Sequence, residues 1–179
     1  MSMFCFQCEQ TAGGKGCTVN GVCGKKENVA NLQDGLTGRL ITLAQAVGAA
    51  GATRKTDDLI VDGLFTAITN VSFDDAAISA LASRIDLAIA EASAKASAPK
   101  PFDMNALWTA ADEDVRSLKS LLLFGMRGMA AYAHHAAALG KRDPEVYAFF
   151  YKGLSALASN AGVPELLELN MEFGQANLK

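Results

Sequence analysis

The sequence predicts an all-α fold, in which two helical bundles follow a glycine-rich N-terminal cap that carries every cysteine. Half of the 179 residues are apolar, 7% are aromatic and four are proline, a balance that favours close-packed helices over sheets. Apolar residues recur at intervals of three and four along most of the chain, and no alternating pattern of useful length predicts a strand. A chain of this length can bury a sizeable core.

The cap is predicted over residues 1–27, where periodicity is weak. Its glycines permit the positive φ angles and close backbone approach that a chain folded around a compact ligand needs. A helical pattern then runs from about residue 28 to about residue 47, and Gly48 and Gly51 supply its end.

Two further helices complete a first bundle, predicted over residues 28–97. Thr56 is the expected N-cap of a helix that ends near residue 68. Ser72 and Asp75 have the spacing of a capping box, and they predict the start of a helix that runs to about residue 96.

A linker is predicted over residues 98–103, because two prolines there break the helical pattern. A second bundle follows over residues 104–179. Asp143 and Pro144 have the types expected at the N-cap and first position of its middle helix. The expected helices of this bundle cover about residues 112–139 and 144–159, and a last helix runs from about residue 164 and stops at residues 177–179.

Charge and hydropathy exclude several classes of protein. The net charge is -3 with both signs interspersed, so neither a nucleic acid nor an anionic membrane surface is an expected partner. The first residues lack the basic and apolar regions of a secretory signal. No apolar run approaches the roughly 20 residues that span a bilayer. We therefore expect a cytoplasmic protein without a membrane partner.

The cysteines are the main candidate site. Cys5, Cys8, Cys17 and Cys23 are separated by gaps of two, eight and five residues, and no cysteine follows them. Four thiolates on such flexible backbone can hold one common ligand, either zinc or an iron–sulfur cluster. Structural zinc sites usually pair two short Cys-x2-4-Cys motifs, and only the first pair here is short. The spacing therefore favours iron–sulfur over zinc.

Two other properties of this site follow from its chemistry. Disulfides suit small secreted domains that lack a core, so a reducing compartment with free thiols fits this chain better. Four thiolates around a zinc ion or around an oxidised 4Fe-4S core leave a net charge of -2 in either case. Lys15, Lys25 and Lys26 are the expected local counter-charges.

Other candidate residues carry weaker signals. His134 and His135 are consecutive on a predicted helix and so point about 100° apart, which does not suit joint binding of one metal. We expect them to be structural or surface residues. Paired carboxylates at predicted helix starts are explained by the helix dipole.

Several motifs resemble one family. They lie at residues 3–11 (MFCFQCEQT), 16–19, 21–25, 30–34, 63–70, 113–118 and 130–135 (AAYAHH). Together these segments cover most of the chain, and they resemble the N-terminal part of the hybrid cluster proteins, also called prismane proteins or hydroxylamine reductases.

This resemblance implies a cofactor and a role. It implies that the four cysteines hold one 4Fe-4S cluster, rather than the 2Fe-2S cluster of members with longer gaps. The cluster would relay electrons from a redox-protein donor to a hybrid cluster, where hydroxylamine is reduced to ammonia and nitric oxide is reduced in a related reaction. Members of the family run to roughly three times this length, in three domains.

The resemblance also implies what this chain lacks. The family holds its hybrid cluster with residues of the later domains, and no cysteine follows Cys23 here. We therefore expect the whole chain to correspond to the first domain of a longer enzyme, inactive by itself, with the remaining domains as a partner. Apolar surface left exposed would favour self-association. The alternative function is a zinc-stapled or metal-free helical module for assembly, without a redox role.

Overall fold

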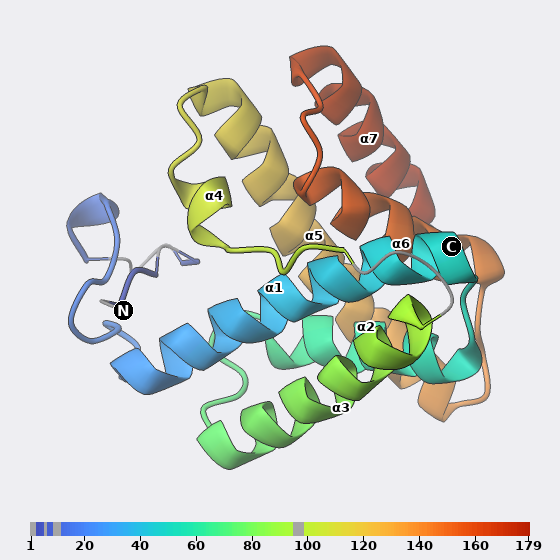
Figure 1. Cartoon of the computed structure of the whole chain (residues 1–179). Helices are drawn as coiled ribbons and strands as arrows, with labels where there is room; N and C mark the ends of the chain where they lie inside the picture. Colours follow the sequence, from blue (N-terminus) through green and yellow to red (C-terminus); the bar gives the residue numbers. More distant parts are fainter. Residues whose placement is uncertain (1–2, 6, 9–11, 95–98) are drawn as a thin grey trace.

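The computed structural model describes residues 3–5, 7–8, 12–94 and 99–179 (Figure 1). Within these ranges it is all-helical, and the only extended pairing is a single bridge between Cys5 and Cys17. The elements are a 3-10 turn η1 (Ala12–Gly14) and the helices α1 (Glu27–Ala50), α2 (Arg54–Thr66), α3 (Asp75–Ser93), α4 (Asn105–Trp108), α5 (Glu113–Ala138), α6 (Pro144–Leu157) and α7 (Val163–Ala176). The predicted all-α class is confirmed.

Helix starts depend on short-range capping, and two of them differ from the prediction. Asp143 accepts from the backbone N–H groups of Glu145 (2.8 Å) and Val146 (3.4 Å), so the predicted start of α6 is confirmed. The N-cap of α2 is Thr53 rather than Thr56. Thr56 instead occupies the third helical position, where its hydroxyl accepts from the Thr53 backbone N–H at 3.0 Å.

The third helix also starts later than its expected capping box. Asp74 is the N-cap of α3, and its carboxylate accepts from the backbone N–H of Ala77 at 3.0 Å. Ser72 lies before the helix, and its carbonyl accepts a hydrogen bond from Gln33 on α1. The expected end of this helix near residue 96 lies outside the described residues. The four-residue helix α4 was not predicted.

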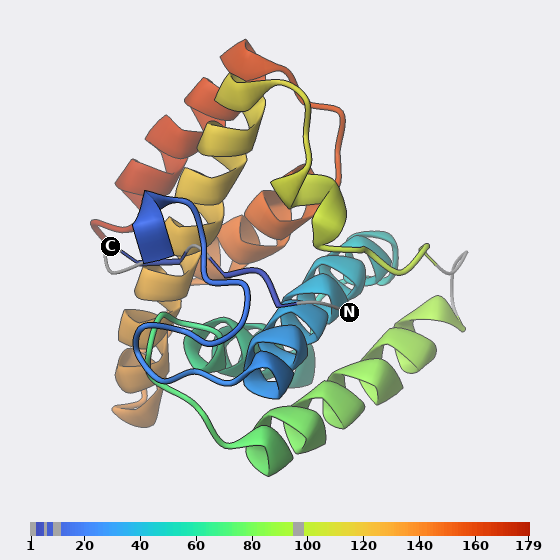
Figure 2. The same cartoon turned by 90° about the vertical axis from the view of Figure 1, so that its left-hand side faces the viewer.

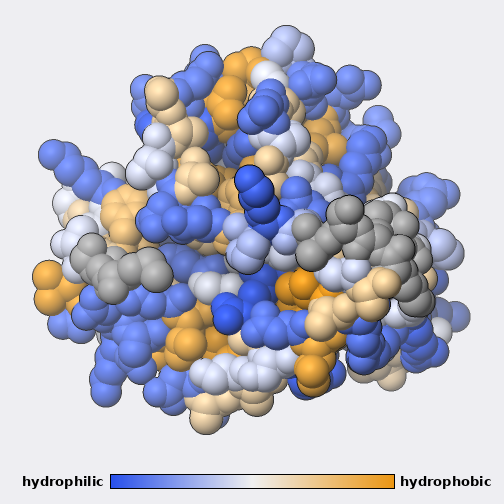
Figure 3. All heavy atoms as spheres, in the orientation of Figure 1, coloured by the Kyte–Doolittle hydropathy of each residue, from blue (hydrophilic) through white to orange (hydrophobic). Residues whose placement is uncertain are grey.

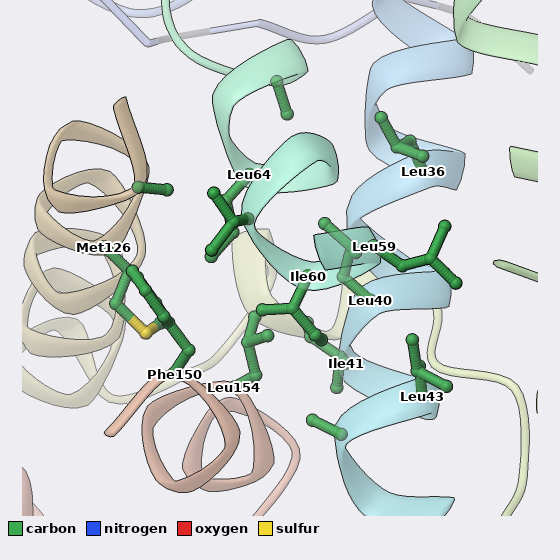
Figure 4. Packing of buried hydrophobic residues seen from close by; sticks show 14 of the residues in the cluster. Leu36, Leu40, Ile41, Leu43, Leu59, Ile60, Leu64, Met126, Phe150 and Leu154 are labelled. Atoms are coloured by element: carbon green, nitrogen blue, oxygen red, sulfur yellow. The ribbon is translucent and has the colours of Figure 1, made fainter. Parts of the chain in front are cut away.

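The core is built around α1, which packs against α3 and α6, while α2 packs against α5 (Figure 1). Figure 4 shows Leu40 of α1 beside Ile60 of α2, and Met126 of α5 beside Phe150 of α6. One continuous set of buried apolar residues thus joins helices from both sides of the predicted linker. The division of the chain into two bundles, residues 28–97 and 104–179, stays a prediction.

The segment at residues 99–104 is docked on α1. The backbone N–H of Phe102 donates to the hydroxyl of Thr42 at 3.1 Å. One turn earlier, Gly38 leaves room for the Phe102 carbonyl, whose oxygen would lie 2.5 Å from a Cβ at position 38. The backbone of this segment therefore rests directly on the α1 backbone at a position that only glycine accommodates without a shift.

Replacing Gly38 with alanine is expected to destabilise the fold by about 1–3 kcal/mol, because the added methyl group collides with backbone rather than with a flexible side chain. Urea unfolding measures the change. Gly48→Ala is the matched control on the same helix, since a Cβ there meets nothing within 4 Å. Equal stability of the Gly38→Ala variant and the wild type would contradict this packing.

The described part of the cap is an irregular segment at the start of α1, outside the helical layers (Figure 1 and Figure 2). Met3 and Cys17 are buried against Ala30 on the first turn of α1, and Cys5 packs partly against them. This small cluster is separate from the main core. The cap is therefore attached to α1, and the Thr69 hydroxyl, after α2, also donates to the Gln7 carbonyl at 3.4 Å.

Some large apolar side chains remain exposed on the second half of the chain. On the face drawn in Figure 3, hydrophobic residues form separate areas among hydrophilic ones. Exposed apolar residues include Tyr132 of α5, Met171 of α7, Leu139 and Leu178. Among the described residues, no helix has both the length and the apolar character needed to cross a bilayer.

Candidate metal centre

Two of the four predicted ligands are paired through their backbones. The Cys5 N–H donates to the Cys17 carbonyl at 3.0 Å, and the Cys17 N–H donates to the Cys5 carbonyl at 2.7 Å. Directly opposed residues of an antiparallel bridge have Cα atoms about 5.5 Å apart and side chains on the same face. The bridge therefore brings these two thiols to one side of the cap, with Cys17 buried and Cys5 half-buried.

Cys23 lies in a tight turn. The Gly21 N–H donates to the Lys25 carbonyl at 2.7 Å, and the Gly24 N–H donates to the Gly21 carbonyl at 2.9 Å. Gly24 has a φ of 88°, which favours glycine. A Cβ at position 21 would lie 3.0 Å from the Cys23 sulfur, so Gly21 leaves the space that this thiol uses.

None of the four cysteines forms a disulfide within the described residues, and Cys8 is half-buried like Cys5 and Cys23. Phe6 and residues 9–11 of the cysteine motif lie outside the described residues. In the ranges that are described, no three His, Cys, Asp or Glu side chains are arranged to hold a metal ion. The structure thus brings Cys5 and Cys17 together, and the convergence of all four thiols stays a prediction.

A buried lysine follows Cys23 two residues later along the chain. Lys25 is only 1% exposed, and its Nζ donates to Oε1 of Gln33 at 2.5 Å. The Gln33 amide in turn donates to the Ser72 carbonyl at 2.7 Å. This chain of hydrogen bonds fixes the lysine head on the second turn of α1.

A buried arginine reaches the same face of α1 from α5. Arg127 is 1% exposed, and its Nη2 donates to the Thr37 hydroxyl at 2.9 Å. That hydroxyl donates to the Gln33 carbonyl at 2.8 Å, so both cations are connected to adjacent turns of one helix. The Nε and Nη1 atoms of Arg127 have no hydrogen-bond partner within the described structure.

The pKa shifts indicate how closely these groups interact. Burial raises the pKa of Asp34 to about 6, although Arg127 and Lys25 both lower it. Burial lowers the pKa of Arg127 to about 10, opposed by the negative charges of Asp34 and Cys5. Burial also raises the pKa of the Cys5 thiol, and Lys25 opposes that shift. The thiol, the carboxylate and the two cations therefore form one electrostatic cluster.

A cavity of about 490 Å³ borders this cluster. Phe4 of the cap, Asp34 and Arg39 of α1 and the segment around Phe102 contribute to its walls. Asp34, whose pKa is affected by both buried cations, thus also lines this cavity.

These residues fit a thiolate-bound cluster. Cys5, Cys8, Cys17 and Cys23 would supply soft thiolate ligands, the donor set that iron–sulfur clusters use. Such a centre would carry about two negative charges in the half-buried cap, because four thiolates outweigh a 2+ core. Lys25 and Arg127 provide two buried positive charges against the single carboxylate of Asp34, so the excess charge has the sign that an anionic centre requires.

The sequence identified only part of this charge arrangement. Of the three lysines expected as counter-charges, Lys25 is buried, whereas Lys15 and Lys26 are exposed. Arg127 was missed because its role depends on a contact with a distant helix. A signal was nevertheless present, since Arg127 falls on the buried stripe of α5 between Leu123 and Ala130.

The two histidines belong to another part of the fold. The ring of His134 has its Nδ1 atom 3.1 Å from the Asp62 carboxylate, and its centroid lies 5.0 Å from that of Phe65. His135 lies 5.6 Å from the same phenyl ring. Both side chains therefore contribute to the contact between α5 and α2, as expected for structural residues.

Comparison with known proteins gives consistent matches along the whole chain. The family model "Prismane/CO dehydrogenase family" matches residues 3–179. Proteins named hydroxylamine reductase are similar to this chain, including one from Acetivibrio thermocellus at 38% identity and one from Desulfitobacterium hafniense strain Y51 at 41%. These alignments cover 100% and 98% of this chain.

The same alignments cover only part of the relatives. The chain spans 37% of the length of each of those two proteins, and 37% of a hydroxylamine reductase from Nitratidesulfovibrio vulgaris that is 37% identical to it. The match includes the cysteine cap, α1 and α5, which together form the candidate site. With a family model that extends from Met3 to the last residue, this chain belongs to the prismane/CO dehydrogenase family.

Proposed function

We propose that this chain is an iron–sulfur electron-relay domain of a hydroxylamine reductase. In this proposal Cys5, Cys8, Cys17 and Cys23 bind one 4Fe-4S cluster, and electrons pass from a redox-protein donor through the cap toward a substrate site in the remaining domains. The whole enzyme would reduce hydroxylamine to ammonia, with nitric oxide as a second substrate. A reducing cytoplasm suits cysteines that form no disulfide.

The observation that carries the proposal is the position of the cysteine cap beside two buried cations. Burying Lys25 and Arg127 is costly unless an anion compensates their charge. Asp34 can compensate only one of them, and burial disfavours even that negative charge. A centre with four thiolates next to Cys5 would supply the missing negative charge.

The chemistry of such a centre supports a relay rather than a substrate site. A 4Fe-4S cluster with four thiolate ligands supplies reversible one-electron transfer and has no open coordination position for a substrate. The protein contributes a half-buried cap, with Phe4 exposed at its surface, where a redox partner can approach. Cys17 and Met3 exclude water on the inner side, where they pack on α1.

Because this chain matches only part of the length of its relatives, its expected partner is the remaining domains of the longer enzyme. The chain spans 37% of the length of its relatives, and those relatives are named for the complete activity. The exposed apolar residues on α5 and α7 would suit a covering domain, and they would favour self-association in the isolated chain.

Anaerobic reconstitution tests the proposal directly. The purified chain should bind about four iron and four sulfide ions and show a broad visible absorption band that fades on reduction. The same sample should form no ammonia from hydroxylamine above a metal-only control. A colourless chain that binds zinc and no iron would contradict the relay and favour a zinc-stapled assembly module. Ammonia formation by the isolated chain would contradict the division of roles between domains.

A further inference from the structure

We propose that Arg127 is the counter-charge of the iron–sulfur cluster and donates hydrogen bonds to its sulfur ligands, so that α5 tunes the reduction potential of a cluster held by the cap. This inference rests on the proposed function and adds a positioning residue that lies far from the cysteines in the sequence.

The first argument is the orientation of the guanidinium group. One nitrogen, Nη2, is held by the Thr37 hydroxyl, whereas Nε and Nη1 are buried without a hydrogen-bond partner in the described structure. A buried donor without a hydrogen-bond partner is unfavourable, and more so when it is charged. The arrangement is therefore incomplete unless an acceptor lies next to these two atoms.

The second argument identifies the acceptor. The aromatic ring of Phe124 lies on one side of the guanidinium group, with its centroid 5.6 Å from Cζ, and cannot take up a full charge. The groups whose negative charge raises the pKa of Arg127 are Asp34 and then Cys5, which is one of the predicted cluster ligands. Sulfur atoms of a cluster bound through Cys5 are anionic acceptors, and hydrogen bonds to such sulfurs raise the reduction potential.

The third argument is the shared position on α1. Cys17 packs on Ala30, while Lys25 and Arg127 are held by Gln33 and Thr37. Residues spaced by three and four lie on one face of a helix, about 5.4 Å apart per turn. The cap and the two cations therefore follow one another along a single face of α1.

The electrostatic consequence has a definite sign. Reduction changes the charge of a tetrathiolate 4Fe-4S centre from about -2 to about -3, and a buried positive charge stabilises the more negative state. Removing the charge of Arg127 should therefore make the cluster harder to reduce. Solvent screens this effect little, because Arg127 is fully buried.

The test compares reduction potentials of reconstituted variants. Arg127→Met removes the charge and the donors, and Arg127→Lys retains the charge. Lys119→Met is the matched control, because Lys119 is another buried cation of α5, but its Nζ is satisfied by the carbonyls of Leu157 (2.9 Å) and Ser159 (2.7 Å). Lys119 lies eight residues before Arg127, about 12 Å along the helix. Iron content and thermal unfolding of each variant establish that it is folded and holds the cluster.

The expected result is a drop of about tenfold in the ratio of reduced to oxidised cluster for Arg127→Met at a fixed potential, equivalent to about 59 mV for one electron. Arg127→Lys should recover at least half of that shift, and Lys119→Met should leave the potential unchanged. A loaded Arg127→Met variant with the wild-type potential would overturn the inference. So would an equal shift in Lys119→Met.

A second variant serves as the test if Arg127→Met is too unstable to bind the cluster. Thr37→Val keeps the guanidinium but removes the bond that orients it, and should lower the potential in the same direction by a smaller amount. A wild-type potential in Thr37→Val would then overturn the inference. A wild-type chain that binds no iron would contradict the proposed function itself, whereas a loaded wild type with unshifted variants would contradict only the role of Arg127.

Discussion

Replacing Cys17 with serine is expected to abolish cluster binding, lowering the iron content of the anaerobically reconstituted chain by more than about tenfold. A serine hydroxyl is a hard, protonated donor at neutral pH and does not replace a soft thiolate ligand. Cys17 is also the buried member of the bridge with Cys5, and it packs between Met3 and Ala30. Iron and sulfide analysis beside a visible spectrum measures the loss.

The full set of single serine variants makes this test more specific. If Cys5, Cys8, Cys17 and Cys23 share one cluster, each substitution should cause a comparable loss of iron, because every position completes the same centre. Thr18→Ser is the control, since Thr18 is exposed and adjacent to Cys17. A Cys17→Ser variant that retains full iron would contradict the assignment. So would a pattern in which Cys8 and Cys23 are dispensable.

Features that depend on residues close together in the sequence could be predicted, whereas features that depend on contacts between distant residues were missed. Asp143 was found as an N-cap because capping acts within three residues. Thr56 was mistaken for Thr53 because both are threonines that take part in one capping box, and composition alone does not distinguish the first position from the fourth.

The candidate site shows the same limit more clearly. The cysteine set could be recognised from spacing, since all four lie within 23 residues. The partners of that set come from elsewhere: Arg127 is on α5, and Asp34 and Thr37 are on α1. Only tertiary packing places these groups together, and a charged residue on an apolar stripe is the one trace that such packing leaves in the sequence.

Replacing Asp34 with asparagine is expected to stabilise the metal-free chain at neutral pH and to remove part of its pH dependence. The Asp34 carboxyl has a pKa of about 6 in the fold, raised by burial from its ordinary value of 3.8. A raised pKa means that the fold favours the protonated group. The stability contributed by that proton is fully present below about pH 4 and is lost as the pH rises through 6.

The magnitude follows from the size of the shift. About two pKa units correspond to about 3 kcal/mol, so above pH 7 the wild type should be less stable than the Asp34→Asn variant by an amount approaching that value. The advantage of the variant should grow as the pH increases from 4 to 7. Urea unfolding of both metal-free proteins under reducing conditions, at pH 4.5, 6 and 7.5, measures this trend.

The control must remove a carboxylate that is not buried with cations. Asp86→Asn serves this purpose, because Asp86 forms an exposed ion pair with Arg39 at 2.9 Å and should change the free energy of unfolding by less than about 1 kcal/mol. If Asp34→Asn instead destabilises the chain at pH 7.5, the attraction of Asp34 to Arg127 and Lys25 outweighs its burial cost. The two cations would then be largely compensated without a cluster, which would weaken the electrostatic argument for an anionic centre in the cap.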